Sequence, residues 1–200
     1  MEVYFATTNK GKFYSISKEL EIYGIKVLHV PINIPEPRSE DPLEVAKEKV
    51  IYAYEKIKKP CIANDGGFFI YSLNGFPKAF VNFVLKTIEI EGILKLMEGI
   101  DDRRCEFRGA IAYLDSTLDE PMIFASRTKG TLTNEPKGEI KEFNWSPLSL
   151  IFVPEGENKT LSEMSEEGYW KWREKRSKES HIAKFAKWFI SRYRDIKNLD

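Results

Sequence analysis

The chain has 200 residues and a balanced charge, with 31 basic and 31 acidic side chains. Its length suits one α/β domain, and its balanced charge excludes a global attraction to nucleic acid or to an anionic membrane, so any anion site must be local. No apolar stretch approaches the roughly 20 residues that span a bilayer, and the two cysteines, Cys61 and Cys105, fit a reduced, cytoplasmic protein without disulfides.

A strand, a basic turn and a helix are predicted at the start of the chain. The hydrophobic run 3–6 indicates the strand, and apolar residues at helical spacing indicate a helix over 10–23. The turn leads into the helix N-terminus, whose free N–H groups favour anions. It therefore predicts an anion site at Thr7, Thr8, Asn9, Lys10 and Lys12, although a basic surface turn with a helix cap is the alternative. The spacing differs from that of a Walker loop.

The following elements indicate an α/β arrangement. We expect a strand at 25–31, a proline-broken loop at 34–38, a helix at 42–57, a buried strand at 61–63, a further strand at 68–73 and two short helices within 79–98.

The second half indicates a β-meander followed by helices. Strands are predicted at 103–114, 121–128 and 129–134, then a loop at 135–147, a strand at 148–153 and helices at about 161–175 and 180–194. Because α/β elements come first, then a meander, then helices, the order favours a mixed β-sheet with a groove between two lobes, within a single domain over 1–200.

Two carboxylates stand where they could bind a divalent cation. Glu36 lies between two prolines on a stiff loop, and Asp65 follows the buried strand and precedes two glycines. Strand ends form the rim where α/β proteins bind ligands, and Mg²⁺ prefers hard oxygen ligands. The alternative is that both segments are ordinary exposed turns.

Taken together, these motifs resemble those of the inosine/xanthosine triphosphate pyrophosphatase family, nearly from end to end. The matching segments are Thr7, Asn9 and Lys12; Glu36; Glu44 with Lys49; 64–67; 75–78; 91–97; 137–138; 154–160; 162–164; and Ser180 with His181.

The resemblance implies an elongated mixed sheet with flanking helices and a central cleft, a homodimer, and Mg²⁺-dependent hydrolysis of nucleoside triphosphates to monophosphates and pyrophosphate. Asp65 and Lys12 would be catalytic, and Glu36 with Asp65 would hold Mg²⁺. The implied substrate-binding residues are Thr7, Thr8, Asn9, Lys10, Lys12, Lys49, Gly66, Phe143, Trp145, Ser146 and His181.

Five positions depart from the family pattern. Asn64 replaces one carboxylate of an acidic pair, Ser146 replaces an aspartate of the base-reading segment, and Ile182 replaces the arginine after His181. Gly66 and Lys78 differ as well. Because the phosphate half is kept and the purine half is altered, we expect changed base preference.

Two other functions compete with this interpretation. The departures fit a nucleotide-binding or partner-binding protein that has lost turnover. The tract 166–178, which we expect to form a solvated helix face with Trp170 and Trp172 packing or stacking nearby, would fit single-stranded RNA. The absence of net positive charge makes nucleic acid the weaker alternative.

Overall fold

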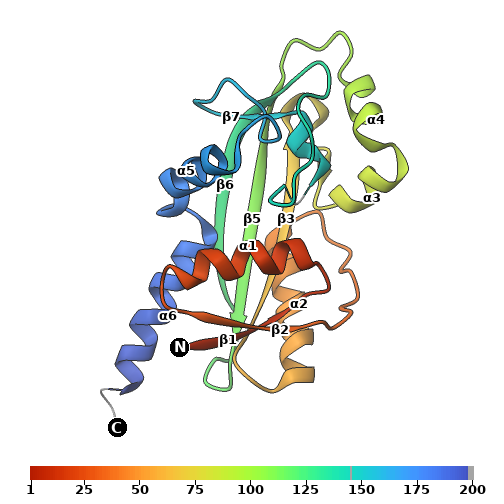
Figure 1. Ribbon diagram of the computed structural model, residues 1–200. Coiled ribbons are helices and arrows are strands. Elements are labelled where there is room, and N and C mark those ends of the chain that lie inside the picture. Colours follow the sequence, from red (N-terminus) through yellow and green to blue (C-terminus); the bar gives the residue numbers. More distant parts are fainter. Residues whose placement is uncertain (145, 198–200) are drawn as a thin grey trace.

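A single mixed β-sheet organises the protein (Figure 1). The computed structural model describes residues 1–144 and 146–197. Within these residues, seven strands form the order β2-β1-β3-β5-β6-β7, with β4 also paired to β3. The strands are β1 (Glu2–Ala6), β2 (Lys26–Val30), β3 (Cys61–Ile70), β4 (Pro77–Lys78), β5 (Arg104–Leu114), β6 (Met122–Leu132) and β7 (Phe152–Pro154). β1 runs parallel to β2 and β3, and the other pairs are antiparallel.

Several helices begin at a residue whose side chain accepts a hydrogen bond from the first turn. They are α1 (Lys10–Glu21), α2 (Pro42–Ile57), α3 (Val81–Thr87), α4 (Glu89–Leu96), α5 (Glu166–Ser177) and α6 (His181–Lys197), with short 3₁₀ turns η1 (Tyr71–Leu73) and η2 (Pro147–Leu150). Asp41 accepts a hydrogen bond from the Leu43 N–H at the start of α2, where Pro42 needs no donor partner. Lys58 ends α2 in a left-handed conformation.

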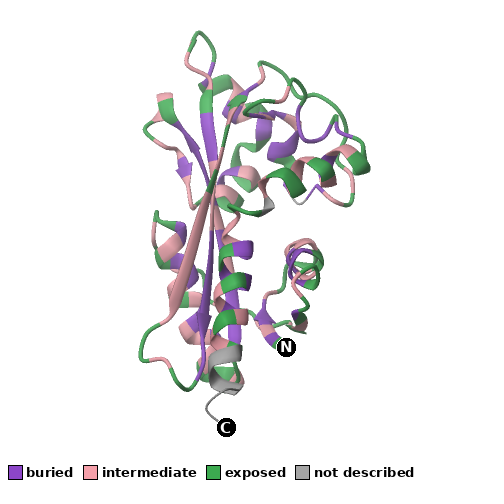
Figure 2. Ribbon diagram, turned by 90° about the vertical axis from the view of Figure 1, so that its left-hand side faces the viewer, coloured by how far each residue is buried: buried purple, intermediate pink, exposed green. Residues whose placement is uncertain are grey.

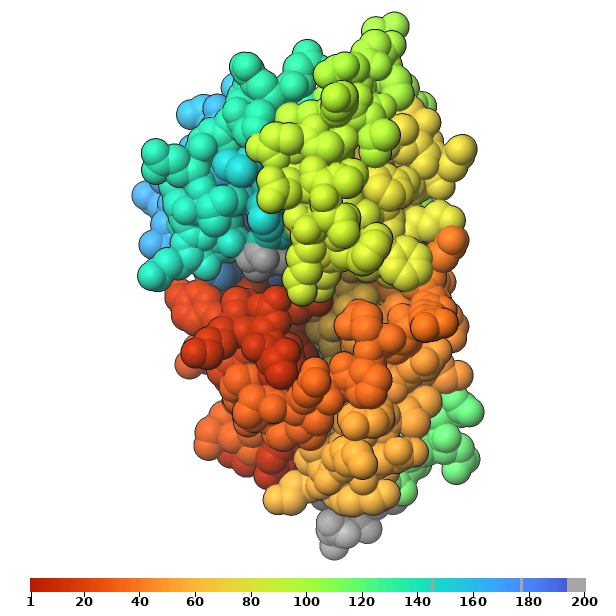
Figure 3. All heavy atoms as spheres, turned by 90° about the vertical axis from the view of Figure 1, so that its right-hand side faces the viewer, coloured from red at the N-terminus to blue at the C-terminus, as the bar shows by residue number. Residues whose placement is uncertain are grey.

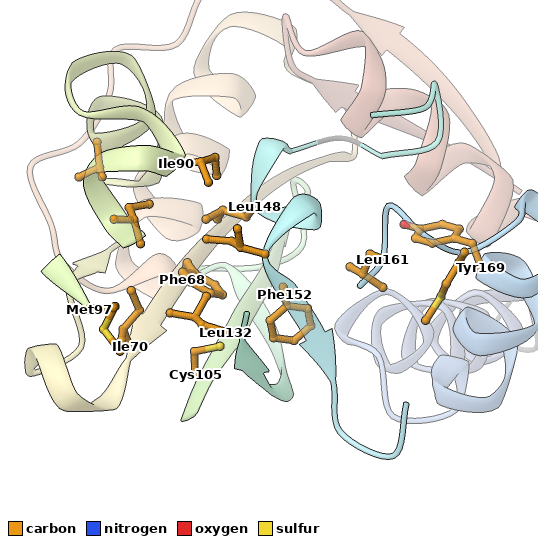
Figure 4. Packing of buried hydrophobic residues seen from close by; sticks show 14 residues of the cluster. Phe68, Ile70, Ile90, Met97, Cys105, Leu132, Leu148, Phe152, Leu161 and Tyr169 are labelled. Carbon is orange, nitrogen blue, oxygen red and sulfur yellow. The ribbon is translucent and has the colours of Figure 1, made fainter. Parts of the chain in front are cut away.

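Helices cover both faces of the sheet (Figure 2). On one face, α2 packs small residues such as Ala46 and Ala53 against Ala63 and Ala112. On the opposite face, α1 and α6 pack Ile16, Leu20, Phe185 and Phe189 against the strands. A third apolar cluster joins α3 and α4 to β3, η2 and β7, with Phe68, Leu148 and Phe152 among its members (Figure 4). The three clusters fix the sheet between its helices.

One edge of β3 is left open in its middle. β1 pairs with Cys61 and Ile62, and β4 pairs with Phe68 and Phe69. Among the described residues, no strand pairs with 63–67 on that edge, whereas β5 pairs with the whole of β3 on the other. Figure 3 shows the surface hollowed on this side, between the N-terminal segment in red and orange and α3 in yellow-green. The sheet therefore exposes a stretch of central strand to ligands.

The predicted mixed α/β fold is confirmed, with three local corrections. The separate strands at 61–63 and 68–73 are one strand, so Asp65 lies inside β3 rather than after it. The meander is a two-stranded hairpin, because the predicted strands 121–128 and 129–134 form the continuous β6. The strand predicted at 148–153 is mostly η2, whose N-cap is Ser146, followed by the short β7.

No helix in the described part of the chain is both long and apolar enough to cross a bilayer. The single domain over 1–200 and the two lobes remain predictions.

Candidate active site

A cavity of about 160 Å³ lies between α1, α5, α6 and the middle of the sheet. Five of the predicted site residues line it, namely Lys12, Asp65, Gly66, Ser146 and His181. Its wall also includes Asn64, Ser126, Asn144, Trp172 and Arg173, which come from β3, β6, a loop and α5. Segments far apart in the sequence therefore meet at the open edge of β3.

Asp65 is the centre of a charged cluster at this edge. Its side chain is only 6% exposed, and its Oδ1 lies 3.0 Å from Lys49 Nζ and 3.7 Å from Lys12 Nζ. Lys49 Nζ also lies 2.7 Å from Oε1 of Glu36. Lys12, Glu36 and Asp65 thus converge through Lys49, although Glu36 comes from a loop and Lys49 from α2.

The charge state of Lys49 follows from these contacts. Burial lowers the pKa of Lys49, but attraction and hydrogen bonding to Asp65 and Glu36 outweigh burial, so its pKa lies above its ordinary value. The site therefore holds two cationic amines within reach of one buried carboxylate.

The basic turn forms the start of α1, next to this cluster. Asn9 caps the helix by accepting a hydrogen bond from the Lys12 N–H at 2.9 Å, and the Asn9 N–H donates to Thr7 Oγ1. Thr8 and Lys10 are exposed on the same turn. The four residues 7–10 do not line the cavity themselves; they surround the helix N-terminus from which Lys12 reaches Asp65.

His181 sits in a hydrogen-bonded chain on the other side of β3. The Asn64 amide donates to the Ala110 carbonyl at 2.8 Å, so its second N–H faces His181 Nε2 at 3.0 Å. Nε2 must therefore accept, and Nδ1–H donates to Ser126 Oγ at 2.8 Å. Burial, and then the nearby Arg173, Lys12 and Lys184, lower the pKa of His181 to about 3. Asn64, expected only as a lost carboxylate, holds a neutral imidazole in one tautomer.

This depressed pKa predicts a specific acid sensitivity. The pKa of His181 falls from 6.5 to about 3 on folding. The contribution of the neutral imidazole to folding stability is therefore fully present above pH 6.5 and is lost as the pH falls toward 3. We expect the free energy of unfolding to fall by up to about 1.4 kcal/mol per pH unit in this window. In His181→Gln, which keeps a donor and an acceptor, melting temperatures between pH 6.5 and 3 should depend less on pH.

The other histidine provides the control for this measurement. His29 stacks on Phe13 and contacts the Thr7 carbonyl, outside the cavity. A His29→Gln variant should keep the wild-type pH dependence. If His181→Gln kept it too, the buried imidazole would not be the cause.

A buried ion pair on the cavity wall was not predicted. Arg173 on α5 pairs with Glu19 on α1, and Ser180 donates to the second oxygen of Glu19. The tract 166–178 is thus not wholly a solvated face, because Arg173 points inward. The only sequence signal was an arginine at helical spacing from Tyr169, which also packs inward.

Two residues of the segment expected to read the base make contacts within the protein. Ser146 Oγ caps η2 by accepting from the Leu148 N–H, although the residue lines the cavity. Phe143 packs against Tyr169, with ring centroids 4.9 Å apart. Gly66 lies on the cavity wall. A Cβ added at this position would lie 3.4 Å from the Arg108 carbonyl oxygen. Trp145 lies outside the described residues.

The donor set at Asp65 fits a divalent cation of the magnesium type. Within 1–144 and 146–197, no three His, Cys, Asp or Glu side chains gather as a metal site. Mg²⁺, however, is commonly held by one or two carboxylates together with phosphate oxygens and waters. Glu36 and Asp65 both lie within 3.0 Å of the same Lys49 ammonium, so their oxygens converge on one cation position.

Known proteins are similar to this chain over most of its length. The model of the Ham1 family matches residues 3–178. The dITP/XTP pyrophosphatase of Methanopyrus kandleri is 37% identical over 94% of this chain and 96% of its own length, and that of Pyrococcus horikoshii is 36% identical over 82% and 86%.

Solved structures show the same fold. A HAM1 protein from Coxiella burnetii has a TM-score of 0.76 at 22% identity, covering 96% of this chain and 99% of its own. The Staphylococcus aureus Ham1 protein has a TM-score of 0.75, also at 22% identity, covering 96% and 100%. With a family match across most of its length and relatives above 35% identity, the chain belongs to the Ham1 family.

Proposed function

We propose that this protein hydrolyses nucleoside triphosphates with deaminated purine bases to nucleoside monophosphates and pyrophosphate. The observation that carries the proposal is the convergence of Lys12, Lys49 and Glu36 on the buried Asp65 beside a cavity. The names of the relatives, dITP/XTP pyrophosphatases, support the same activity.

In the proposed reaction, this chain's residues bind the triphosphate and activate water. Lys12, Lys49 and the free N–H groups at the first turn of α1 bind phosphate oxygens, with Asn9, Thr7, Thr8 and Lys10 around them. Asp65 orients a water and takes its proton as the water oxygen bonds to the α-phosphorus. The bond from that phosphorus to the bridging oxygen breaks, and pyrophosphate leaves.

Glu36 and Asp65 would hold Mg²⁺, and Lys49, which contacts both carboxylates, would bind the phosphates. When bound, Mg²⁺ supplies charge neutralisation on the triphosphate.

The proposed cation site makes Glu36→Gln a direct test. Loss of one anionic ligand should raise the Mg²⁺ concentration for half-maximal activity by about tenfold, with most of kcat recovered at saturating Mg²⁺. Glu40→Gln is the matched control, since Glu40 lies on the same loop but pairs with Lys78. An unchanged Mg²⁺ requirement in Glu36→Gln would contradict its assignment as a ligand.

The activity itself is tested by product analysis. The protein is incubated with XTP, ITP, dITP and the four common ribonucleoside triphosphates in Mg²⁺, and pyrophosphate and orthophosphate are measured separately. We expect pyrophosphate from the deaminated nucleotides. Release of orthophosphate alone, or of neither product, would overturn the proposal.

The base end of the site is proposed to include Phe143, Trp145, Ser146, His181 and Gly66. The alternative of a nucleotide-binding protein without turnover rests on the sequence departures alone. The site gives no observation in its favour, because Lys12, Lys49, Glu36 and Asp65 meet in one cluster. A homodimer, a cytoplasmic location and the lack of a nucleic-acid partner remain expectations, of which the first is tested by measuring the mass in solution.

A further inference from the structure

Two buried hydrogen-bond donors on the cavity wall have no partner. They are Nδ2 of Asn144 and Nε1 of Trp172. Among the described residues, the other buried unpaired atoms are Ser17 Oγ and Arg192 Nε, and neither residue lines the cavity. Buried polar groups nearly always have a hydrogen-bond partner, so two such donors on one cavity point to acceptors on its occupant.

The hydrogen bonding of Asn144 fixes which end of its amide is free. Asn144 is 8% exposed, and its Oδ1 accepts from the Lys141 N–H at 3.1 Å. A backbone N–H can only donate, so the oxygen must face Lys141. The NH₂ group is therefore the unpaired end. The Asn144 N–H in turn donates to the Lys141 carbonyl at 2.8 Å, which holds the residue in place.

Trp172 is held as firmly by aromatic packing. Its ring lies 5.7 Å from that of Tyr169, which on another side packs against Phe143 at 4.9 Å. The indole nitrogen can only donate. The two donors are connected through Tyr169, because Trp172 packs on it and Asn144 follows Phe143, which also packs on it. Aromatic packing holds Trp172 in place, and the hydrogen bonds with Lys141 hold Asn144.

Few acidic groups line the cavity. The carboxylates that line the cavity are Glu19 and Asp65. Glu19 is already bound by Arg173 and Ser180, and Asp65 by Lys49. Arg176, another wall residue, adds a second cationic side chain on α5. A ligand group that brings its own donors here would meet donors and cations.

We propose that Asn144 and Trp172 select the base by donating to its carbonyl oxygens, with xanthine preferred. This inference rests on the proposed function, in which the triphosphate lies at Lys12 and Asp65. Xanthine has carbonyls at C2 and C6, so each of its edges offers acceptors. Hypoxanthine lacks the carbonyl at C2, guanine has an amino group there, and adenine has an amino group at C6. The expected order is XTP, then ITP, then GTP and ATP.

Two variants test each donor with minimal change in shape. Asn144→Asp keeps the acceptor for Lys141 but replaces the free NH₂ by an acceptor oxygen. Trp172→Phe removes the N–H and keeps the ring against Tyr169. We expect each variant to lower the preference for XTP over GTP, in kcat/KM, by about tenfold, and Asn144→Asp to gain activity on GTP, whose amino group can now donate.

Matched controls lie outside the cavity. Trp170→Phe makes the same chemical change on the same helix, where the Trp170 N–H donates to Glu166. Asn158→Asp adds a carboxylate on an exposed loop. Both should leave the XTP/GTP ratio within about twofold of wild type. Binding of XMP, IMP and GMP, measured by calorimetry, gives the same comparison without turnover.

The outcomes separate the two claims. No pyrophosphate from any nucleotide overturns the proposed function, and the inference is then judged on monophosphate binding. If the protein releases pyrophosphate but Asn144→Asp and Trp172→Phe keep the wild-type base order, the function stands and the inference is wrong. Tighter binding of GMP than of XMP by the wild-type protein also overturns it.

Discussion

Asp65→Asn is expected to lower kcat for pyrophosphate release about 10³-fold. Asparagine keeps the shape of the side chain but can neither take a proton from water nor attract a cation as a carboxylate does. Asp65 is buried inside β3 and contacts Lys49 and Lys12, whereas the side chain of Glu36, the other carboxylate of the cluster, is 66% exposed and contacts Lys49 from a loop. The measurement is the initial rate with XTP at saturating Mg²⁺.

The control for Asp65→Asn is Asp119→Asn, which changes an exposed carboxylate between β5 and β6. It should keep wild-type kcat. Because Lys49 retains Glu36 as a partner, Asp65→Asn should fold, which a melting curve checks. If folded Asp65→Asn retained more than about a tenth of wild-type kcat, Asp65 would not be the catalytic base.

Gly109→Ala should lower the free energy of unfolding by about 3 kcal/mol and disturb the site at the same time. A Cβ at Gly109 would lie 2.3 Å from Cε1 and 2.7 Å from Nδ1 of His181. The imidazole is held in place, because Asn64 and Ser126 contact its two ring nitrogens. Denaturant unfolding at pH 7.5 measures the loss, so that the imidazole is neutral in both states.

Gly66 gives this prediction an internal control. It is paired with Gly109 across β3 and β5, but a Cβ there meets only the Arg108 carbonyl at 3.4 Å. Gly66→Ala should therefore change stability by less than about 1 kcal/mol. If the contact with the ring is the cause, adding His181→Ala should recover part of the loss in Gly109→Ala, giving a non-additive double-mutant cycle. Strict additivity would argue against it.

Local signals predicted the elements that depend on local chemistry. The bounds 42–57 of α2 match because Asp41 and Pro42 mark its start and Pro60 stops the chain beyond it. The first turn of α1 also matches, since Asn9 is an N-cap as its sequence context indicates. Both signals act within a few residues, so tertiary packing did not override them.

The errors in predicting strands arose where glycine is needed for packing between distant segments rather than for a turn. Gly66 and Gly67 suggested a turn after Asp65, but they lie inside β3. Gly67 allows close approach of the Lys78 carbonyl and of Pro42, which a Cβ would meet at 2.7 and 2.9 Å. A glycine placed for packing between distant segments looks the same in a sequence as one placed for a turn.

Much of the candidate active site could not be predicted for the same reason. Lys12, Glu36, Lys49 and Asp65 were predicted from motifs, and their convergence is geometric. Trp172 and Arg173 carried no motif, and Asn144 had no assigned role although it lies within the segment expected to read the base. The importance of all three depends on which cavity they face. Only coordinates bring α1, α5 and Asn144 to one cavity.

The open stretch on the edge of β3 also separates what must stay rigid from what can vary. Asp65 is fixed by the full-length pairing of β3 with β5, so its position does not depend on any loop. Glu36 reaches the same cluster on a proline-rich loop, and Asn144 and Ser146 line the cavity from the connection between β6 and η2, whereas Lys12 and Lys49 are carried by helices. Insertions or exchanges in those connections can reshape the pocket for another nucleotide while the reactive carboxylate keeps its place. A family built on this sheet could thus diversify its substrates without rebuilding its chemistry.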